Sequence, residues 1–258
     1  MKAPLTKILG FVALTFAVFF VGLYGRGWLD HVVSIPFPDK YWRYAYFTVV
    51  WLTGVPVLYL GLRYGFRNVL HELGLKVGLI AGLKWGFVIT LPMLIGYAAV
   101  SSEFNFGIAD LIAYSVLAAF AEEVLFRGFL FGQLSRYANW KLWMGALAEA
   151  SIFGVVHLYQ ANNIMNAVGI FAITFAGGLL FGWLYIRWNY NLWLPIVLHM
   201  LMNAYWSVFD MGKNALGGTY GNVFRAAAVV LAVIVTYRKT RPAAVPVGID
   251  DTRLAAVD

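Results

Sequence analysis

Long runs of apolar residues, separated by short polar stretches, are the feature that most constrains how this chain can fold. A transmembrane helix needs about 20 mostly apolar residues. Eight runs of roughly this length lie between the charged residues and the clusters of Gly, Pro and Asn; they cover residues 8–25, 44–62, 79–100, 110–131, 142–160, 164–186, 192–209 and 222–237. The sequence therefore predicts an all-α, polytopic integral membrane protein built as a bundle of about eight transmembrane helices.

The composition supports this class and excludes several others. Hydrophobic residues make up 62% of the chain and charged residues only 12%, whereas a soluble domain averages about 25% charged residues. So few charges cannot cover a surface that faces water, and a disordered or rod-like chain is equally excluded. The chain has no cysteine, which rules out a disulfide framework, a thiolate metal site and a cysteine nucleophile.

The net charge of +7 is explained by the membrane and does not indicate nucleic-acid binding. The Lys and Arg residues lie mainly at the ends of the apolar runs, where anionic headgroups attract them. With the N-terminus inside, the inner segments hold 13 of the 19 basic residues and the outer segments five, while Arg127 lies within a run. The positive-inside rule then predicts that both termini lie on the cytoplasmic side.

The first apolar run has one feature of a signal peptide. Lys2 and Lys7 precede it, but the stretch from Ile8 to Gly25 is long and no A-x-A cleavage site follows. We therefore expect a retained helix. A second mixed segment, residues 68–84, is expected to form an amphipathic helix at the inner surface that leads into the third span.

Ionisable residues within spans are rare, because a charge at the bilayer centre costs about 2.5–3.5 kcal/mol on insertion scales. In this chain they cluster in the middle third of the sequence, and the first three runs are nearly free of them. The residues concerned are Glu122, Glu123, Arg127, Glu149, His157 and His199. Such residues should face a bundle interior or a water-filled cavity, and their clustering predicts a functional site.

The spacing of these residues suggests separate roles. Glu123 and Arg127 are four residues apart, with the acid on the N-terminal side, which favours an ion pair along one helix face. Glu122 is rotated by about 100° from Glu123 and shares Arg127 less easily. It is left as a carboxylate without a local partner, which suits a general base.

Two further pairs have the same spacing of four residues. Phe153 lies one turn before His157, so its ring can pack beside the imidazole. His199 lies one turn before Asn203, and two donors on one helix face can stabilise a developing oxyanion. A single histidine in a membrane is more commonly a helix–helix hydrogen-bonding residue; the three patterns in this order on three spans are far more specific.

These patterns resemble the motifs of the CAAX protease and bacteriocin-processing family, which includes the Ras-converting CAAX endopeptidase of the endoplasmic reticulum. The resemblance covers roughly residues 105–210, and elsewhere the chain resembles the family only as membrane sequence. The motifs are Glu122-Glu123-x-x-x-Arg127, Phe153-x-x-x-His157 and His199-x-x-x-Asn203.

The resemblance implies an intramembrane glutamate endopeptidase that needs no metal or other cofactor. Glu122 and His157 would activate the attacking water, and His199 with Asn203 would stabilise the oxyanion. Glu123 would pair with Arg127, and Phe153 would shape the pocket. The substrate would be a protein or peptide precursor, either lipidated or not, cleaved near its C-terminus or a membrane segment.

Three other functions stay open at this point. Two Glu and two His could bind zinc in a membrane hydrolase, although no H-E-x-x-H motif is present. A non-enzymatic scaffold, immunity factor or chaperone could retain the motifs for stability. A proton-coupled transporter would need a substrate pathway and usually repeat symmetry, and the sequence has no internal repeat.

The sequence thus divides into three parts: residues 1–104 with the N-terminal spans and the amphipathic segment, residues 105–210 with the catalytic core, and residues 211–258 with the last span and a polar tail. Glu149, eight residues before His157, could be an acid that supports the catalytic residues from behind, a cavity-lining group, or a partner for Arg136 or Lys141. A structural or cavity role is favoured. The absence of a retention motif favours the cytoplasmic membrane of a prokaryote.

Overall fold

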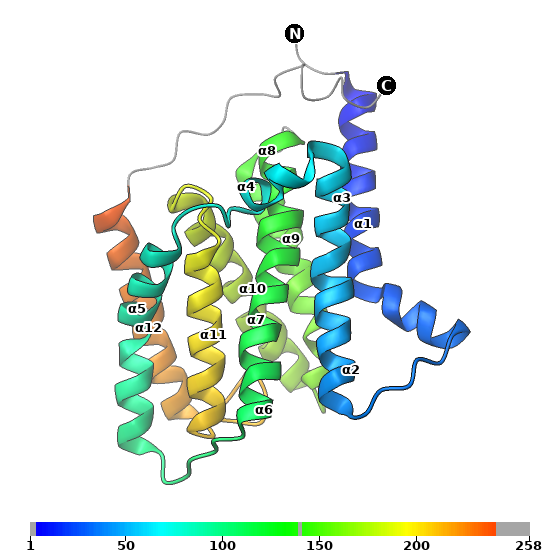
Figure 1. Cartoon of the computed structure of the whole chain (residues 1–258). Coiled ribbons are helices and arrows are strands. Elements are labelled where there is room, and N and C mark those ends of the chain that lie inside the picture. The colour runs from blue at the N-terminus through cyan, green and yellow to red at the C-terminus, as the bar shows by residue number, and fades with distance from the viewer. Residues whose placement is uncertain (1–3, 139–140, 241–258) are drawn as a thin grey trace.

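Helices form in all eight apolar runs of the sequence (Figure 1). The computed structural model describes residues 4–138 and 141–240, and no residue in these two stretches lies in a β-strand. The helices formed by one element each are α1 (Leu5–Val32), α5 (Leu79–Val100), α9 (Leu142–Val156), α10 (Ile164–Arg187), α11 (Trp193–Val208) and α12 (Thr219–Lys239). The predicted all-α class is confirmed.

Two further rods are built from consecutive helical pieces that follow one another without a break. The first joins α2 (Lys40–Tyr46), η1 (Phe47–Gly54) and α3 (Val55–Tyr64). The second, which we call the central rod, joins α6 (Ile108–Asp110), η3 (Leu111–Leu117), α7 (Ala118–Glu123), η4 (Val124–Phe131) and α8 (Gly132–Tyr137). The pieces η1, η3 and η4 are π-helical, and π-helical turns are frequent near functional sites.

Six of the rods in the described part of the chain are long and apolar enough to cross a membrane. The two others are the central rod, which carries Glu122, Glu123 and Arg127 near its middle, and α11, which has 16 residues. The chain is therefore an integral membrane protein by the length and apolar character of its helices. The number of eight spans and the orientation of the termini stay predictions.

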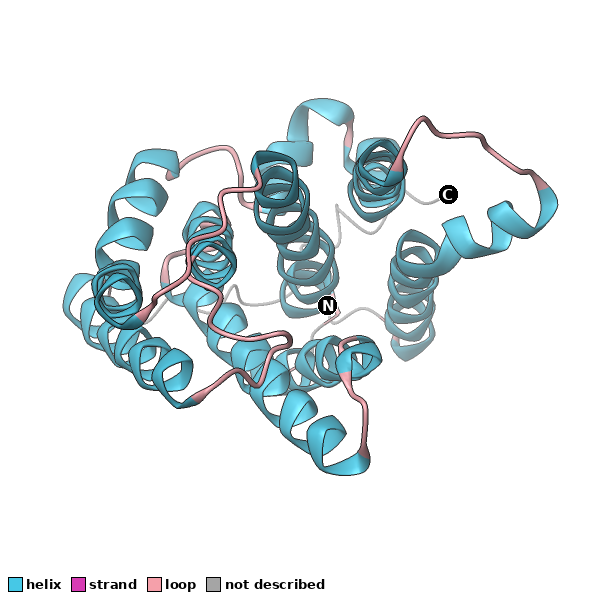
Figure 2. Cartoon of the chain, turned by 90° about the horizontal axis from the view of Figure 1, so that it is seen from below, coloured by secondary structure: helices cyan, strands magenta, loops and turns pink. Residues whose placement is uncertain are grey.

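The central rod has neighbours on several sides. Its η4 piece packs against α1 and α9, and its α7 piece packs against α11. Outside it, α5 packs against α11 and α12, and α9 packs against α10; Figure 2 shows these helices end-on. Every residue from Val124 to Phe131 is buried, so this part of the rod is surrounded by protein and cannot face lipid.

The first apolar run packs into this bundle. Phe11 and Phe19 of α1 are buried in the main core, and Phe19 makes an edge-to-face contact with Phe126 of the central rod, at 5.1 Å between ring centroids. The last turns of α1 bend away from the bundle and lead into the loop before α2 (Figures 1 and 2).

The segment of residues 68–84 differs from the expected continuous amphipathic helix. It forms only the short helix α4 (Val69–Leu73), a turn, and the start of α5. The helix ends because Gly74 adopts φ 79°, and a side chain there would collide with the Tyr190 carbonyl. Glu72 is only 3% exposed, so the segment is bound to the bundle. The expected polar tail beyond Thr240 lies outside the described residues.

Candidate active site

Two neighbouring glutamates of the central rod face different surroundings. Glu122 and Glu123 lie at the end of α7, and successive helical residues point about 100° apart. The Glu123 side chain is fully buried, whereas 26% of the Glu122 side chain is exposed. The predicted separation of roles is therefore built into the helix geometry: one carboxylate points into the protein and its neighbour points to an accessible space.

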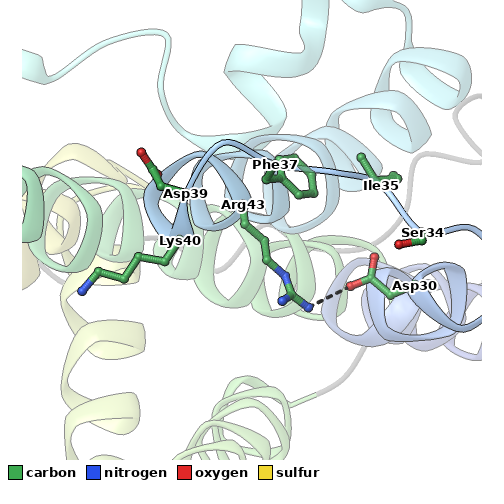
Figure 3. Close-up of a pocket in the computed structure, with 7 residues that line it drawn as sticks. All are labelled: Asp30, Ser34, Ile35, Phe37, Asp39, Lys40 and Arg43. Carbon is green, nitrogen blue, oxygen red and sulfur yellow. Dashed lines mark hydrogen bonds and ion pairs between the residues drawn. The ribbon is translucent and has the colours of Figure 1, made fainter.

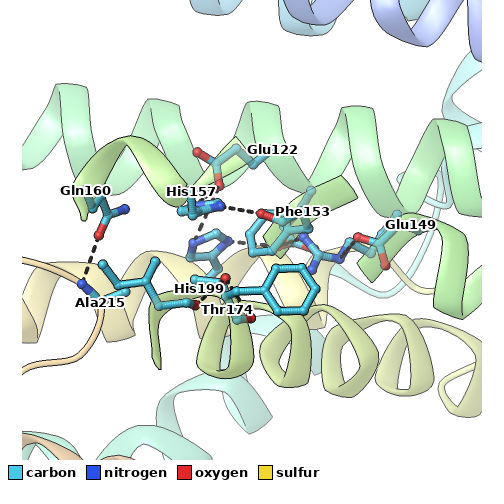
Figure 4. Close-up of polar contacts among 12 residues, drawn as sticks. Glu122, Glu149, Phe153, His157, Gln160, Thr174, His199 and Ala215 are labelled. Atoms are coloured by element: carbon cyan, nitrogen blue, oxygen red, sulfur yellow. Dashed lines mark hydrogen bonds and ion pairs between the residues drawn. The ribbon is translucent and has the colours of Figure 1, made fainter. Parts of the chain in front are cut away.

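His157 caps the C-terminal end of α9 and is held by its own helix. Its Nδ1 lies 2.7 Å from the backbone oxygen of Phe153, which can only accept a hydrogen bond, so Nδ1 carries the hydrogen. The other ring nitrogen, Nε2, lies 4.0 Å from Oε2 of Glu122. In the neutral ring this nitrogen is an acceptor, and it is directed toward the carboxylate (Figure 4).

His199 reaches the same carboxylate from α11. Its Nδ1 lies 2.8 Å from Oε1 of Glu123, and its Nε2 lies 4.0 Å from Oε2 of Glu122. A single oxygen of Glu122 therefore faces the Nε2 atoms of both histidines. These separations are too long for direct hydrogen bonds, and polar groups farther apart than about 3.5 Å can be joined by a bridging water.

Arg127 joins two buried carboxylates. Its Nη1 donates to Oε1 of Glu123 at 3.0 Å, the pair that the spacing predicts. Its Nε lies 3.2 Å from Oε1 of Glu149 on α9, and all three side chains are fully buried. Of the alternatives open for Glu149, pairing with Arg136 or Lys141 is not what the structure shows, because the basic group beside Glu149 is Arg127.

Phe153 lies between the arginine and the histidines. Its ring centroid is 4.4 Å from that of His157 and 6.4 Å from that of His199. The Arg127 guanidinium carbon lies 4.3 Å from the same ring. Phe153 therefore shields the buried ion pairs from the accessible side of Glu122, consistent with the pocket-shaping position that its spacing suggests.

Asn203 lies one turn after His199 on α11 and is partly exposed. Within residues 4–138 and 141–240 its side chain has no hydrogen-bond partner. The structure thus brings Glu122, His157 and His199 together around one point, and it places Asn203 next to that group along the helix without a contact to it.

Glu122 and His157 lie at the same depth in the bundle when depth is counted from the observed helix ends at Tyr137 and Leu142. With the fourth run ending at residue 131, the sequence places His157 deeper than Glu122, which suggests a late start or a tilt of the fifth run. The fifth helix starts at Leu142, as predicted, but the central rod continues to Tyr137. Glu122 lies 15 residues before that end and His157 lies 15 residues after Leu142, so both lie at the same level.

Two contacts of the site escape sequence reasoning. One is the hydrogen bond between Glu123 and His199, and the other is the approach of Glu149 to Arg127. Both join residues of different helices, and spacing along one helix contains no information about them. The only sequence signal is that Glu149 is an ionisable residue inside an apolar run.

Other parts of the described chain offer no alternative site of this kind. No group of three or more His, Cys, Asp or Glu residues within it is arranged to hold a metal ion. A pocket of about 430 Å³ opens at the loop between α1 and α2 (Figure 3). Its lining residues are Asp30, Ser34, Ile35, Phe37, Asp39, Lys40 and Arg43, and none of them belongs to the three motifs.

Comparison with known proteins gives a family match for the part of the chain that carries these residues. Residues 104–205 match the family described as type II CAAX prenyl endopeptidase Rce1-like. This match includes all seven residues of the three motifs, and it confirms the resemblance seen in the sequence. No solved structure matches the chain significantly.

Similar individual proteins come from bacteria. "Putative membrane peptidase YdiL" of Bacillus subtilis (strain 168) is 30% identical over 95 residues, which are 37% of this chain and 34% of that protein. An uncharacterized 24.3 kDa protein of Escherichia coli is 35% identical over 94 residues, 36% of this chain and 40% of its own. The protein YpbD of B. subtilis is 31% identical over 97 residues, 38% and 43% of the two chains. The chain thus spans less than half the length of each of these relatives.

Proposed function

We propose that this protein, whose residues 104–205 match the Rce1-like family of type II CAAX prenyl endopeptidases, is an intramembrane glutamate endopeptidase. It hydrolyses a peptide bond near the C-terminus, or near a membrane segment, of a protein or peptide substrate. The observation that carries this proposal is the convergence of two histidine Nε2 atoms on one oxygen of Glu122, at 4.0 Å each.

The first chemical step is the activation of water. A water molecule that bridges Glu122 and His157 donates one proton to the carboxylate, while the unprotonated Nε2 of His157 orients it. The resulting hydroxide oxygen forms a bond to the carbonyl carbon of the peptide, and the C=O electron pair moves onto the oxygen. General-base catalysis of this kind contributes about 10²–10⁴-fold to rate.

The oxyanion that forms is stabilised by His199 and Asn203. Because the Nδ1 hydrogen of His199 is held by Glu123, the ring donates from Nε2 only when both nitrogens carry a hydrogen. The Glu123 carboxylate compensates the positive charge of that doubly protonated ring. When the C–N bond breaks, Glu122 returns its proton to the leaving nitrogen, and the products are a free carboxyl group and a free amine.

The surroundings fit this chemistry. The buried residues Phe126 and Phe153, with Phe181 beside His199, exclude bulk water, and a low dielectric strengthens hydrogen bonds to a developing charge. The partners we propose are a protein or peptide substrate, which can carry a lipid, and the surrounding bilayer; the location we propose is the cytoplasmic membrane of a prokaryote.

The test is a comparison of the wild type with E122Q in the same membrane. Purified protein in lipid nanodiscs is incubated with peptides ending in a C-a-a-X box, prenylated or not, and products are identified by mass spectrometry. In parallel, the terminal peptides of all membrane proteins are compared in cells that carry either variant at equal expression. The second arm finds a substrate that has no C-a-a-X box.

We expect new termini with the wild type and none with E122Q, at an unchanged melting temperature. Glu72→Gln serves as the matched control, since Glu72 is also a buried carboxylate near an arginine but lies outside the site; it should cleave as the wild type does. Identical termini with wild type and E122Q, under normal growth and under stress, would favour the scaffold over the peptidase.

A further inference from the structure

Gln160 lies three residues after His157 and outside the three motifs. His157 follows the last residue of α9, and the next three residues form the single 3₁₀ turn η5 (Leu158–Gln160). The end of a helix is held by fewer backbone hydrogen bonds than its interior, so the position of His157 depends on what fastens this turn. Within the turn, the Gln160 amide donates to the His157 carbonyl at 3.1 Å.

The Gln160 side chain fastens the turn to a distant part of the chain. Its Oε1 accepts a hydrogen bond from the backbone N–H of Ala215 at 2.9 Å, and Figure 4 shows this contact near His157. Ala215 belongs to the loop of residues 209–218 between α11 and α12, which we call the clasp loop. The turn after His157 is therefore bonded to the loop that follows the helix of His199.

The clasp loop is itself held by side chains of α12 and α11. Arg225 of α12 donates to the backbone oxygens of Ala215 and Leu216, at 2.9 and 3.4 Å. Asn222 donates to the same Leu216 oxygen at 2.8 Å, and the Arg225 guanidinium carbon lies 4.8 Å from the ring of Trp206 on α11. A cation within an apolar helix is costly, and the hydrogen bonds of Arg225 fix this loop. The N–H of Ala215 therefore reaches Gln160 from a firm support.

The end of α11 also bonds the segment that leads into the central rod. The Asn105 amide donates to the backbone oxygen of Val208, the last residue of α11, at 2.8 Å. The elements that carry Glu122, His157 and His199 are thus joined through the end of α11 and the clasp loop, in addition to their contacts at the site.

From these contacts we infer that Gln160 is a positioning residue of the proposed peptidase. Its hydrogen bond to Ala215 fixes the turn after His157 to the clasp loop, and thereby holds Nε2 of His157 at 4.0 Å from the Glu122 carboxylate. The inference rests on the proposed function, because the position of His157 matters for rate only if this ring orients the attacking water. A displacement of about 1 Å from the productive geometry can lower a rate by about 100-fold.

The test compares kcat and KM of cleavage for the wild type, Q160L and Q160E. Leucine offers no acceptor to the Ala215 N–H, whereas a glutamate oxygen accepts it whether the carboxyl group is ionised or not. We expect Q160L to lower kcat by about 10–100-fold with KM unchanged, because the substrate still binds while the water is misplaced. Q160E should restore most of the wild-type kcat.

The chain offers a matched control for this substitution. Gln133 is the only other glutamine in the sequence, and its Oε1 accepts a hydrogen bond from the Tyr64 hydroxyl at 2.9 Å. Q133L therefore removes the same kind of acceptor from the same kind of bond between separate elements, away from the site. It should lower the melting temperature and leave kcat per folded molecule unchanged. Melting temperatures are measured for every variant, so that activity is expressed per folded molecule.

A distance measurement tests the clasp loop without any substrate. Because the chain has no cysteine, spin labels can be attached at M165C on α10 and K213C in the clasp loop, two exposed positions. Dipolar electron paramagnetic resonance in lipid nanodiscs should give one narrow distance distribution with Gln160 or Q160E. We expect a broader or displaced distribution with Q160L, and the narrow one with Q133L.

The two measurements separate this inference from the proposed function. Unchanged kcat in Q160L would overturn the inference and leave the proposed function in place, and so would a fall in kcat that Q160E does not reverse or that Q133L matches. If Q160L fails to accumulate, Q160N replaces it with the same expectation, since its amide is drawn back by one methylene group. If the wild type cleaves nothing, the proposed function fails; a broader distribution in Q160L would then leave the bond as a structural one, and the positioning role would fail.

Discussion

Among residues 4–138 and 141–240, two buried clusters bring a glutamate against an arginine, and they differ in how their polar atoms are bonded. The first, which we call the α4–α8 cluster, consists of Glu72, Arg136, Tyr137 and Tyr185. There, Tyr137 donates to Oε2 of Glu72 at 2.7 Å, and Arg136 donates to the Glu72 backbone oxygen at 2.8 Å and to the Tyr185 hydroxyl at 3.0 Å. Its polar groups are bonded to one another, so the cluster holds α4 against the bundle.

The second cluster, in the middle of the bundle, is arranged differently. In its buried half, Arg127 pairs with Glu123 and Glu149, although both oxygens of Glu149 and Oε2 of Glu123 have no hydrogen-bond partner among the described residues. Its other half is open: Glu122 faces His157 and His199 at 4.0 Å each. Each imidazole is held at Nδ1 and leaves Nε2 free for a third partner. The comparison teaches how a structural cluster differs from a reactive one. In the α4–α8 cluster the polar groups bond to one another, whereas in the mid-bundle cluster two imidazoles are held in place and keep one ring nitrogen available for a further hydrogen bond.

The largest effect should come from breaking the ion pairs in the buried half of the mid-bundle cluster. Arg127→Ala leaves Glu123 and Glu149 buried without a counter-charge, and breaking a buried pair in this way costs about 3–5 kcal/mol. We expect a sharp loss of folded protein, measured by the yield of monodisperse protein and by thermal unfolding in detergent. Normal yield and stability would contradict the structural role of the pair.

A slightly smaller effect, on activity alone, is expected at the open half. Asn203→Ala removes a donor for the oxyanion, and the loss of one such donor costs about 10²–10³-fold in kcat, or about 2.7–4 kcal/mol. Because the Asn203 side chain has no partner within the described residues, the melting temperature should not change. A variant with full kcat would remove Asn203 from the mechanism and leave His199 as the donor.

The α4–α8 cluster should respond in the opposite way. Tyr137→Phe removes one hydrogen bond to the Glu72 carboxylate, and hydrogen bonds to charged groups contribute about 1.5–3 kcal/mol. We expect a lower melting temperature with unchanged kcat per folded molecule. A loss of activity that exceeds the loss of folded protein would show that the two clusters are coupled, and the contrast drawn above would fail.

The smallest effect is expected from metal removal. Incubation of the protein with 1,10-phenanthroline or EDTA should leave the rate of cleavage unchanged, because the proposed base is Glu122 itself. Addition of zinc after chelation provides the control. Inhibition by the chelator that zinc reverses would favour the metal-dependent hydrolase and would require a different role for the open half of the cluster.

Spacing along single helices predicted much of the candidate site. Partners four residues apart, such as Glu123 with Arg127 and Phe153 with His157, follow from the pitch of the helix, and the structure places both pairs in contact. The ends of the helices were harder to predict from the sequence. The central rod continues to Tyr137 because Gln133 and Leu134 are buried and extend the core by more than one turn. The amphipathic segment was misjudged because Glu72 is buried against Tyr137 and Arg136 and does not face water.

The sequence by itself determined that the chain forms apolar helices in a membrane and which residues share a helix face, since both depend on local composition and on a fixed helical period. Only the tertiary structure decided that Glu149 meets Arg127, that Glu123 holds His199, and that His157 lies level with Glu122. These contacts join separate helices, and their distances depend on how residues such as Phe153, with its ring, and Gly178, without a side chain, let the helices pack. That packing is a property of the whole bundle, and no single segment of the sequence contains it.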